Sequence, residues 1–141
     1  ANLRISIQEN NIDFGLLDQG QTINSTEAGD FFTVQNDGSV DVDLAVYADS
    51  SPFTSATGGA NTLPTSNFQV YGNDSATEGP ATVNEALQNI NSSAGFAVTV
   101  VTGLDELDSQ DLATIGISVT VPVDEVSGNK DSTVTILATE N

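Results

Sequence analysis

The chain has 141 residues and a mass of 14.6 kDa, which is enough for one domain with its own hydrophobic core. Two basic residues stand against 20 acidic ones, and the net charge of −18 excludes nucleic acid and anionic membrane surfaces as partners. Cysteine, histidine, methionine and tryptophan are absent, which argues against thiolate and imidazole catalysis and against zinc or redox chemistry.

Two further features of the sequence bear on where the protein resides. No apolar run approaches the length of a membrane span, so we expect no membrane insertion. The sequence begins with Ala1 rather than Met, which indicates a processed, secreted protein, although a trimmed chain would begin in the same way.

The first ten residues predict a β-strand with one apolar face. Leu3, Ile5 and Ile7 alternate with polar residues, and such a row needs a groove, either in its own domain or in a neighbouring molecule. Arg4, the only arginine, is expected to find a carboxylate on an adjacent strand. The alternative is an ordinary exposed side chain worth well under ~1 kcal/mol.

The rest of the chain predicts strand after strand, separated by Gly, Asn, Asp and Ser. Alternation or apolar content marks strands at 12–17, 31–35, 40–47, 68–71, 96–100, 115–123 and 134–138. The sequence Asn36-Asp37-Gly38 after the second of these is a hairpin signal. A short, marginal helix is expected over 82–90, where Val83, Leu87 and Ile90 would share a face. About eight strands at this spacing predict an all-β protein with a β-sandwich architecture.

Two acidic stretches are candidate cation sites. The stretch 36–43 resembles a calcium loop only vaguely, and a hairpin followed by a solvated strand face is the preferred interpretation. The loop 105–111 is the better candidate for Ca²⁺, with Asp105, Glu106, Asp108 and Asp111 as ligands, although solvated loop charge is again favoured. No other cofactor is expected. No pair of carboxylates stands out as the machinery of a glycoside hydrolase, so we do not expect an enzyme.

Three sequons for N-glycosylation, at Asn24, Asn73 and Asn91, fall in predicted loops. About three are expected by chance in a chain this rich in Asn, Ser and Thr, so only their positions are informative. They are candidates if the organism glycosylates its proteins.

Two stretches together resemble a known family. The first, 12–53, combines a strand, a Gly-containing break and an F-x-V-x-N-x-G-S-x-D-x-x-L hairpin pattern. The second, 112–139, has a V-x-V-P segment and a turn before a T-V-T-I-x-A strand. The pattern is similar to the TasA/camelysin-type biofilm matrix fibre proteins and the related archaeal bundling pilins. The chain departs from those proteins in having less lysine, which puts similar lateral bundling in doubt.

The resemblance implies a single jelly-roll or immunoglobulin-like β-sandwich (11–141) with an N-terminal donor strand (1–10) that completes the sheet of the next subunit. Carried onto this chain, Leu3, Ile5 and Ile7 are the inserted side chains, and Asn10 and Asn11 are the hinge.

The expected function is therefore that of a structural subunit of an extracellular filament on the cell surface, with identical subunits as partners, joined head to tail. The alternative is a monomeric cell-surface carbohydrate-binding or adhesin domain that binds through the long loop 49–67, with Phe53 and Leu63 as its anchors. In that case the first strand folds back into its own sandwich.

Overall fold

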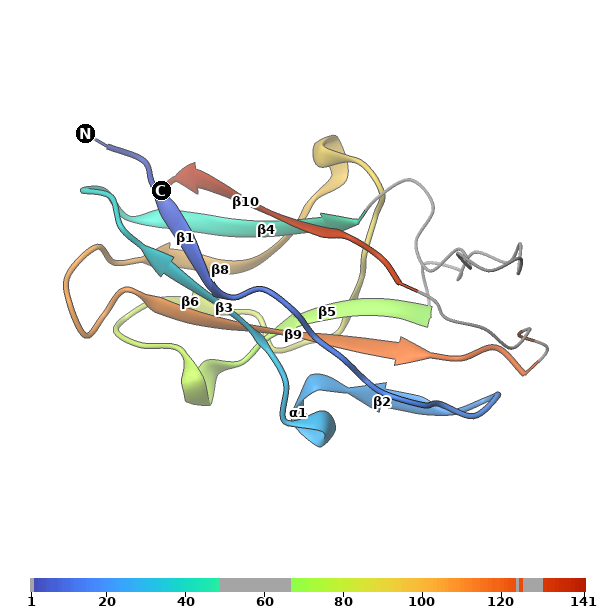
Figure 1. Ribbon diagram of the computed structural model, residues 1–141. Helices are drawn as coiled ribbons and strands as arrows, with labels where there is room; N and C mark the ends of the chain where they lie inside the picture. The colour runs from blue at the N-terminus through green and yellow to red at the C-terminus, as the bar shows by residue number, and fades with distance from the viewer. Residues whose placement is uncertain (1, 49–66, 124, 126–130) are drawn as a thin grey trace.

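The computed structural model describes residues 2–48, 67–123, 125 and 131–141, and within them the chain forms two antiparallel β-sheets packed face to face (Figure 1). The predicted all-β sandwich is confirmed. Ten strands are present in these ranges, whereas about eight were expected. No helix in the described part of the chain is long and apolar enough to cross a membrane.

The larger sheet has six strands, five of which follow the order β1-β3-β9-β5-β7, while β2 pairs with the far half of β9. Their bounds are β1 Ile5–Glu9, β2 Thr22–Asn24, β3 Phe32–Asn36, β5 Phe68–Gly72, β7 Gln88–Asn89 and β9 Leu112–Thr120. Since β1 pairs with β3 alone, it is an edge strand.

The smaller sheet has four strands in the order β10-β4-β8-β6. Their bounds are β4 Val42–Ala48, β6 Thr82–Val83, β8 Val98–Leu104 and β10 Val134–Glu140. Three short helical turns complete the described structure, namely α1 Ser25–Ala28, η2 Asp74–Ala76 and η3 Ala94–Phe96.

The core lies between the sheets and is built from the alternating inward residues of both. On β4 this alternation is regular: Val42, Leu44 and Val46 are buried while the residues between them are only half-buried. The other large core side chains include Val34, Phe68, Val70, Val100, Leu104, Ile115 and Ile117.

Strand β9 is buried on both faces, because its outer face is also covered. Gly116 pairs with Tyr71 on β5, and the Tyr71 ring lies so close to Gly116 that any added Cβ would overlap it. The Tyr71 hydroxyl then reaches Thr26 in α1, where it bonds the backbone N at 3.0 Å and Oγ1 at 2.7 Å. A glycine in the middle of the longest strand is thus explained by close packing.

The expected hairpin at Asn36-Asp37-Gly38 is wrong. Strands β3 and β4 on either side of it belong to different sheets, so this segment carries the chain from one layer to the other. Asn36 holds this corner. Its side chain is 1% exposed, and Nδ2 donates to the carbonyls of Val40 (2.8 Å) and Leu104 (2.9 Å) while Oδ1 accepts from the Gly38 N–H (3.0 Å). Hairpin and corner use similar turn residues, and only the strand pairing separates them.

The expected helix over 82–90 is also wrong. Its two ends pair with strands of different sheets, since Val83 lies opposite Val101 on β8 and Gln88 lies opposite Val70 on β5. Between them the Asn84 side chain accepts from the Ala86 N–H at 3.1 Å, a local turn that competes with a helix. The helical spacing of its apolar residues was accidental.

The region 12–17 is not a strand, although Ile12 and Phe14 pack against the core. The Asp13 carboxylate accepts from the Gly15 N–H at 2.8 Å, Gly15 has a positive φ of 70°, and Leu16 is fully exposed. The short helix α1 was missed. Asn24 caps its first turn and Gly29 ends it with φ 66°, so a capping signal was present in the sequence.

We predict that Asn36→Ala lowers the free energy of unfolding by about 1–3 kcal/mol, because the buried carbonyls of Val40 and Leu104 lose their donor. Urea unfolding followed by circular dichroism measures this loss. Asn89→Ala is the matched control, because the exposed Asn89 side chain accepts from that of Gln69, its one side-chain bond to a described residue, and should change stability little. Equal losses in the two variants would contradict the role of Asn36 in the corner.

Candidate functional site

The N-terminal segment 2–9 lies along the β3 edge and continues past it onto the corner. Within β1, Ile5 is opposite Asn36 and Ile7 is opposite Val34 in an antiparallel register. Beyond β3, the Asp37 N–H donates to the Arg4 carbonyl and the Ser39 N–H donates to the Asn2 carbonyl, both at 2.9 Å. The segment is therefore held mainly by its backbone, as a strand added to a sheet edge is.

The three predicted donor side chains differ in burial. Ile5 packs against the core, whereas Leu3 is 48% and Ile7 43% exposed. On its own sandwich the segment therefore buries one of the three in part and leaves more apolar area exposed on the other two. Their burial in another subunit stays a prediction.

The residues around these side chains are exposed. The Arg4 side chain is at the surface and forms no ion pair with a described residue, so its pairing with a carboxylate stays a prediction. Asn10 and Asn11, the predicted hinge, are exposed and lie outside regular structure. The segment is thus held largely by backbone bonds and by the contact of Ile5 with the core, and it is followed by an exposed linker.

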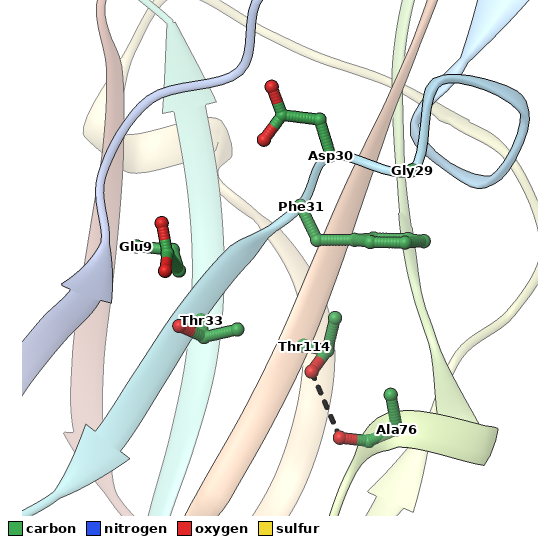
Figure 2. A pocket seen from close by; sticks show the side chains of 7 residues that line it. All are labelled: Glu9, Gly29, Asp30, Phe31, Thr33, Ala76 and Thr114. Atoms are coloured by element: carbon green, nitrogen blue, oxygen red, sulfur yellow. Dashed lines mark hydrogen bonds between the residues drawn. The ribbon is translucent and has the colours of Figure 1, made fainter.

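An open hollow of about 400 Å³ lies near the other end of β1. Its lining includes the carboxylates of Glu9 and Asp30, the Phe31 ring and the Thr114 hydroxyl (Figure 2). Two of these groups are already engaged, because Asp30 accepts from the Asp13 N–H at 2.9 Å and Thr114 donates to the Ala76 carbonyl at 2.9 Å. The lining has the mixture of an aromatic face and oxygen acceptors that a hydroxylated or cationic ligand uses.

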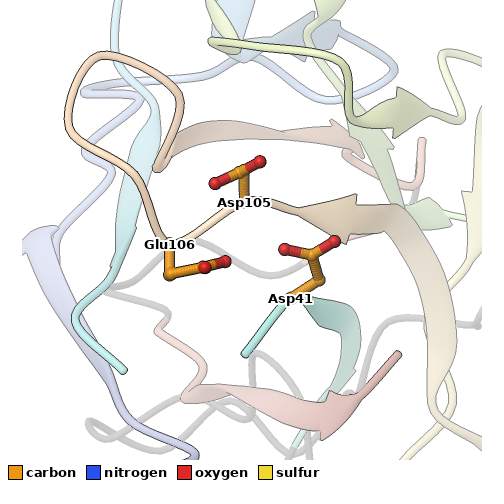
Figure 3. Close-up of side chains that lie close together, drawn as sticks. All are labelled: Asp41, Asp105 and Glu106. Carbon is orange, nitrogen blue, oxygen red and sulfur yellow. The ribbon is translucent and has the colours of Figure 1, made fainter. Parts of the chain in front are cut away.

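Three carboxylates gather where β4 begins and β8 ends. Val42 pairs with Leu104, so the neighbouring Asp41 and Asp105 come together, and Glu106 joins them (Figure 3). One oxygen from each side chain lies within 4.8 Å of the others. Oxygens of this kind suit Ca²⁺, which takes six to eight of them, and exposed acidic groups also gather without an ion.

The other acidic candidates lie elsewhere. Asp108 is exposed and outside the group of three, and Asp111 is buried, where it accepts from the Gln35 side chain at 3.0 Å. Asp43 is used structurally, since it accepts from the Gly103 N–H at 3.0 Å and from the Asn141 side chain at 2.8 Å. Sequence reasoning placed Asp41 in a different candidate site, because its distance from Asp105 along the chain hides their adjacency.

The three sequon asparagines all take part in local hydrogen bonds. Asn24, which ends β2 rather than lying in a loop, caps α1, and Asn73 accepts from the Ser75 hydroxyl at 2.8 Å. The Asn91 Nδ2 donates to the Phe96 carbonyl at 3.0 Å, so a sugar on that nitrogen would require this bond to break. Residues 49–66 of the predicted binding loop, with Phe53 and Leu63, lie outside the described residues.

The comparisons with known proteins assign the chain to no family. No family model and no curated protein matches the chain. Among solved structures, the chain is similar to part of a family 123 glycoside hydrolase from Clostridium perfringens, studied for glycolipid glycan hydrolysis, with a TM-score of 0.49 and 13% identity. The match covers 88% of this chain and 19% of that one, so the chain spans about a fifth of the hydrolase.

We predict that Ile5→Asp loosens the N-terminal segment, because a carboxylate replaces the side chain that packs against the core. Amide hydrogen exchange in β1 should become about tenfold faster or more, while exchange in β9 stays slow. Gln8→Asp adds the same charge at an exposed position of the same strand and serves as the control. Equal protection of β1 in both variants would show that Ile5 does not hold the segment.

We predict that Glu106→Gln raises the free energy of unfolding by about 0.5 kcal/mol at low ionic strength, because it relieves repulsion among three adjacent carboxylates. High salt should abolish most of this gain by screening. Asp108→Asn removes a charge from the same loop outside the group and should gain less. Urea unfolding at two salt concentrations measures both, and an equal gain in the two variants would assign the effect to net charge alone.

Proposed function

We propose that the chain is a structural subunit of an extracellular filament, a pilus or biofilm matrix fibre, in which the N-terminal strand of each subunit inserts into the sheet of the next identical subunit. The observation that carries the proposal is the docking of residues 2–9. They add a strand to an exposed sheet edge through backbone bonds, and they precede an exposed linker. This arrangement supports exchange, since an identical strand from a neighbour meets an identical edge.

The physics of the edge favours its being filled. Without residues 2–9, β3 would present unpaired backbone groups to solvent, which is a template for pairing with another chain. A head-to-tail contact of this kind uses two different surfaces of each subunit. When the rotation does not close into a ring, repetition gives a filament.

Charge and apolar burial act against each other in such a polymer. Subunits with a net charge of −18 repel, and salt weakens that repulsion. Leu3 and Ile7 are about half exposed on their own sandwich and would be so on an identical edge, so only contacts between subunits outside that edge would add burial. Full burial of such side chains contributes about 1.5–3 kcal/mol each, of which the exposed half is still to be gained.

A monomeric cell-surface carbohydrate-binding or adhesin domain is the second candidate. The position of β1 on its own β3 supports it, as does the hollow lined by Glu9, Asp30 and Phe31. The two candidates differ in one measurable property, which is whether residues 2–9 ever occupy the edge of another chain.

Cross-linking tests this property directly, because the chain has no cysteine and each added thiol is unique. Ser6 and Gln35 are directly opposite in the β1–β3 register, at a spacing that a disulfide or a short thiol-reactive linker can span. We predict that a chain with Ser6→Cys and a chain with Gln35→Cys, unfolded and refolded together at about millimolar concentration so that exchange competes with the tether, form a covalent dimer on oxidation. Denaturing gel electrophoresis detects it.

The double variant, with both cysteines in one chain, is the positive control for the geometry. A second mixture, of Ser6→Cys with Asp108→Cys, controls for random collisions, since Asp108 is exposed and outside the docking edge. Cross-linking of the double variant within single chains, with no dimer from the first mixture, would reject the filament proposal and favour the monomeric candidate.

A further inference from the structure

The acceptor edge does not end with β3. Strand pairing with β3 covers residues 5–9 of the N-terminal segment, with a register shift between Ile7 and Glu9, but residues 2–4 are bound by the corner 37–39. Besides the two backbone bonds from Asp37 and Ser39, the Ser39 hydroxyl accepts from the Asn2 N–H at 2.9 Å. The corner therefore provides a separate set of contacts for the first residues of the strand.

Gly38 is the residue at which this corner and the strand come closest. A Cβ built on Gly38 would overlap the Asn2 carbonyl oxygen, and it would lie 3.0 Å from the Arg4 N and 3.2 Å from the Asn2 C. All three are backbone atoms of the strand, which cannot turn away as a flexible side chain can. Only a residue without a side chain leaves room for the strand at this point.

The conformation of Gly38 gives no other reason for a glycine. The glycines with positive φ in the described chain are Gly15, Gly20, Gly29, Gly79 and Gly103, and Gly38 is not among them. Gly38 therefore lies outside the left-handed region that favours glycine, and the obstacle to alanine is the docked strand itself. The corner cannot easily shift to make room, because the buried Asn36 side chain fixes both the Gly38 N–H and the Val40 carbonyl.

From this geometry we infer that the acceptor site of the subunit is the β3 edge together with the corner 37–39, that its occupant is the segment 2–9 of a second copy of this chain, and that Gly38 is the residue that admits it. The inference rests on the proposed function. It adds that the donor strand and the acceptor edge of one subunit can be altered by separate substitutions, because Ile5 belongs to the inserted strand and Gly38 only to the receiving edge.

The separation can be tested in the full-length chain with the cysteine pair described above. Ile5→Asp is also placed in the Gln35→Cys chain, so that its own strand does not compete for the edge. Gly38→Ala is then placed either in this chain, where it alters the receiving edge, or in the Ser6→Cys chain, where it alters the edge that holds the donor strand before exchange. Dimer from the first mixture should fall at least about tenfold, equivalent to about 1.4 kcal/mol. Dimer from the second should rise rather than fall, because the altered corner of the Ser6→Cys chain holds its own strand less tightly.

Gly95→Ala is the matched control, because the nearest atom to its added Cβ is the Ser93 Oγ at 3.8 Å. Circular dichroism and urea unfolding check that the Gly38→Ala sandwich is folded. If it is not, Ser39→Ala takes its place, since it removes only the acceptor for the Asn2 N–H and should lower dimer formation in the acceptor orientation alone.

Each outcome decides one question. If a folded Gly38→Ala chain accepts the strand as well as Gly95→Ala does, the corner is not part of the acceptor site, although the filament proposal stands. If Gly38→Ala reduces dimer equally in both orientations, donor and acceptor are not separable and the inference is overturned. If the chains without glycine substitutions give no dimer, the filament proposal itself has failed.

Discussion

The pairing of three other strands with β9 is the constraint on which the sandwich depends. Strand β5 lies along one side of β9, and β3 and β2 share the other side, one at each half. Seven consecutive residues of β9 are buried, because the core covers one face while Tyr71 and the short helical turns cover the other. Strand β1 pairs only with β3 and not with β9, so it lies at the edge of the sheet.

This hierarchy explains why the N-terminal strand is the element best suited to exchange. Its loss would remove one ladder of backbone bonds and the contact of Ile5 with the core, while the β9 pairings and the large core side chains would remain. An inner strand such as β4, whose alternate residues are buried and which pairs on both sides, could not leave without opening the core. The proposed exchange therefore uses the part of the sheet whose removal costs least.

The sequence predicted the strands whose alternation is regular and failed where tertiary pairing decides. Strands β4, β9 and β10 overlap the expected segments, because one face of each meets the core and the period of two is visible along the chain. The helix predicted over 82–90 was wrong because Val83 and Gln88 pair with strands of different sheets, and no local sequence pattern shows this pairing. The hairpin predicted at Asn36-Asp37-Gly38 was wrong for a related reason, since a turn within a sheet and a crossing between sheets use the same residue types.

The residues of the candidate sites were also predictable only where they are close together in the sequence. Asp105 and Glu106 are neighbours in the sequence, so their grouping was predictable. The position of Asp41 beside them depends on the β4–β8 register, which the sequence does not show. Asp111 is outside the group and accepts a hydrogen bond from the Gln35 side chain. The hollow beside Phe31 combines residues from β1, β3 and β9, and the sequence contains no signal for it.

The exposed linker at Asn10 and Asn11 has a thermodynamic consequence. The contacts of residues 2–9 are nearly the same on the subunit's own edge and on a neighbour's, so the balance between the two states is set by how strongly the tether concentrates the strand at home. Short flexible tethers give effective concentrations of the order of millimolar. A dilute subunit would then remain closed, and assembly would require local crowding, a seed that captures released strands, or further contacts between subunits, outside the exchanged edge, that cover Leu3 and Ile7. A cell could store such subunits as monomers and confine growth to existing filament ends.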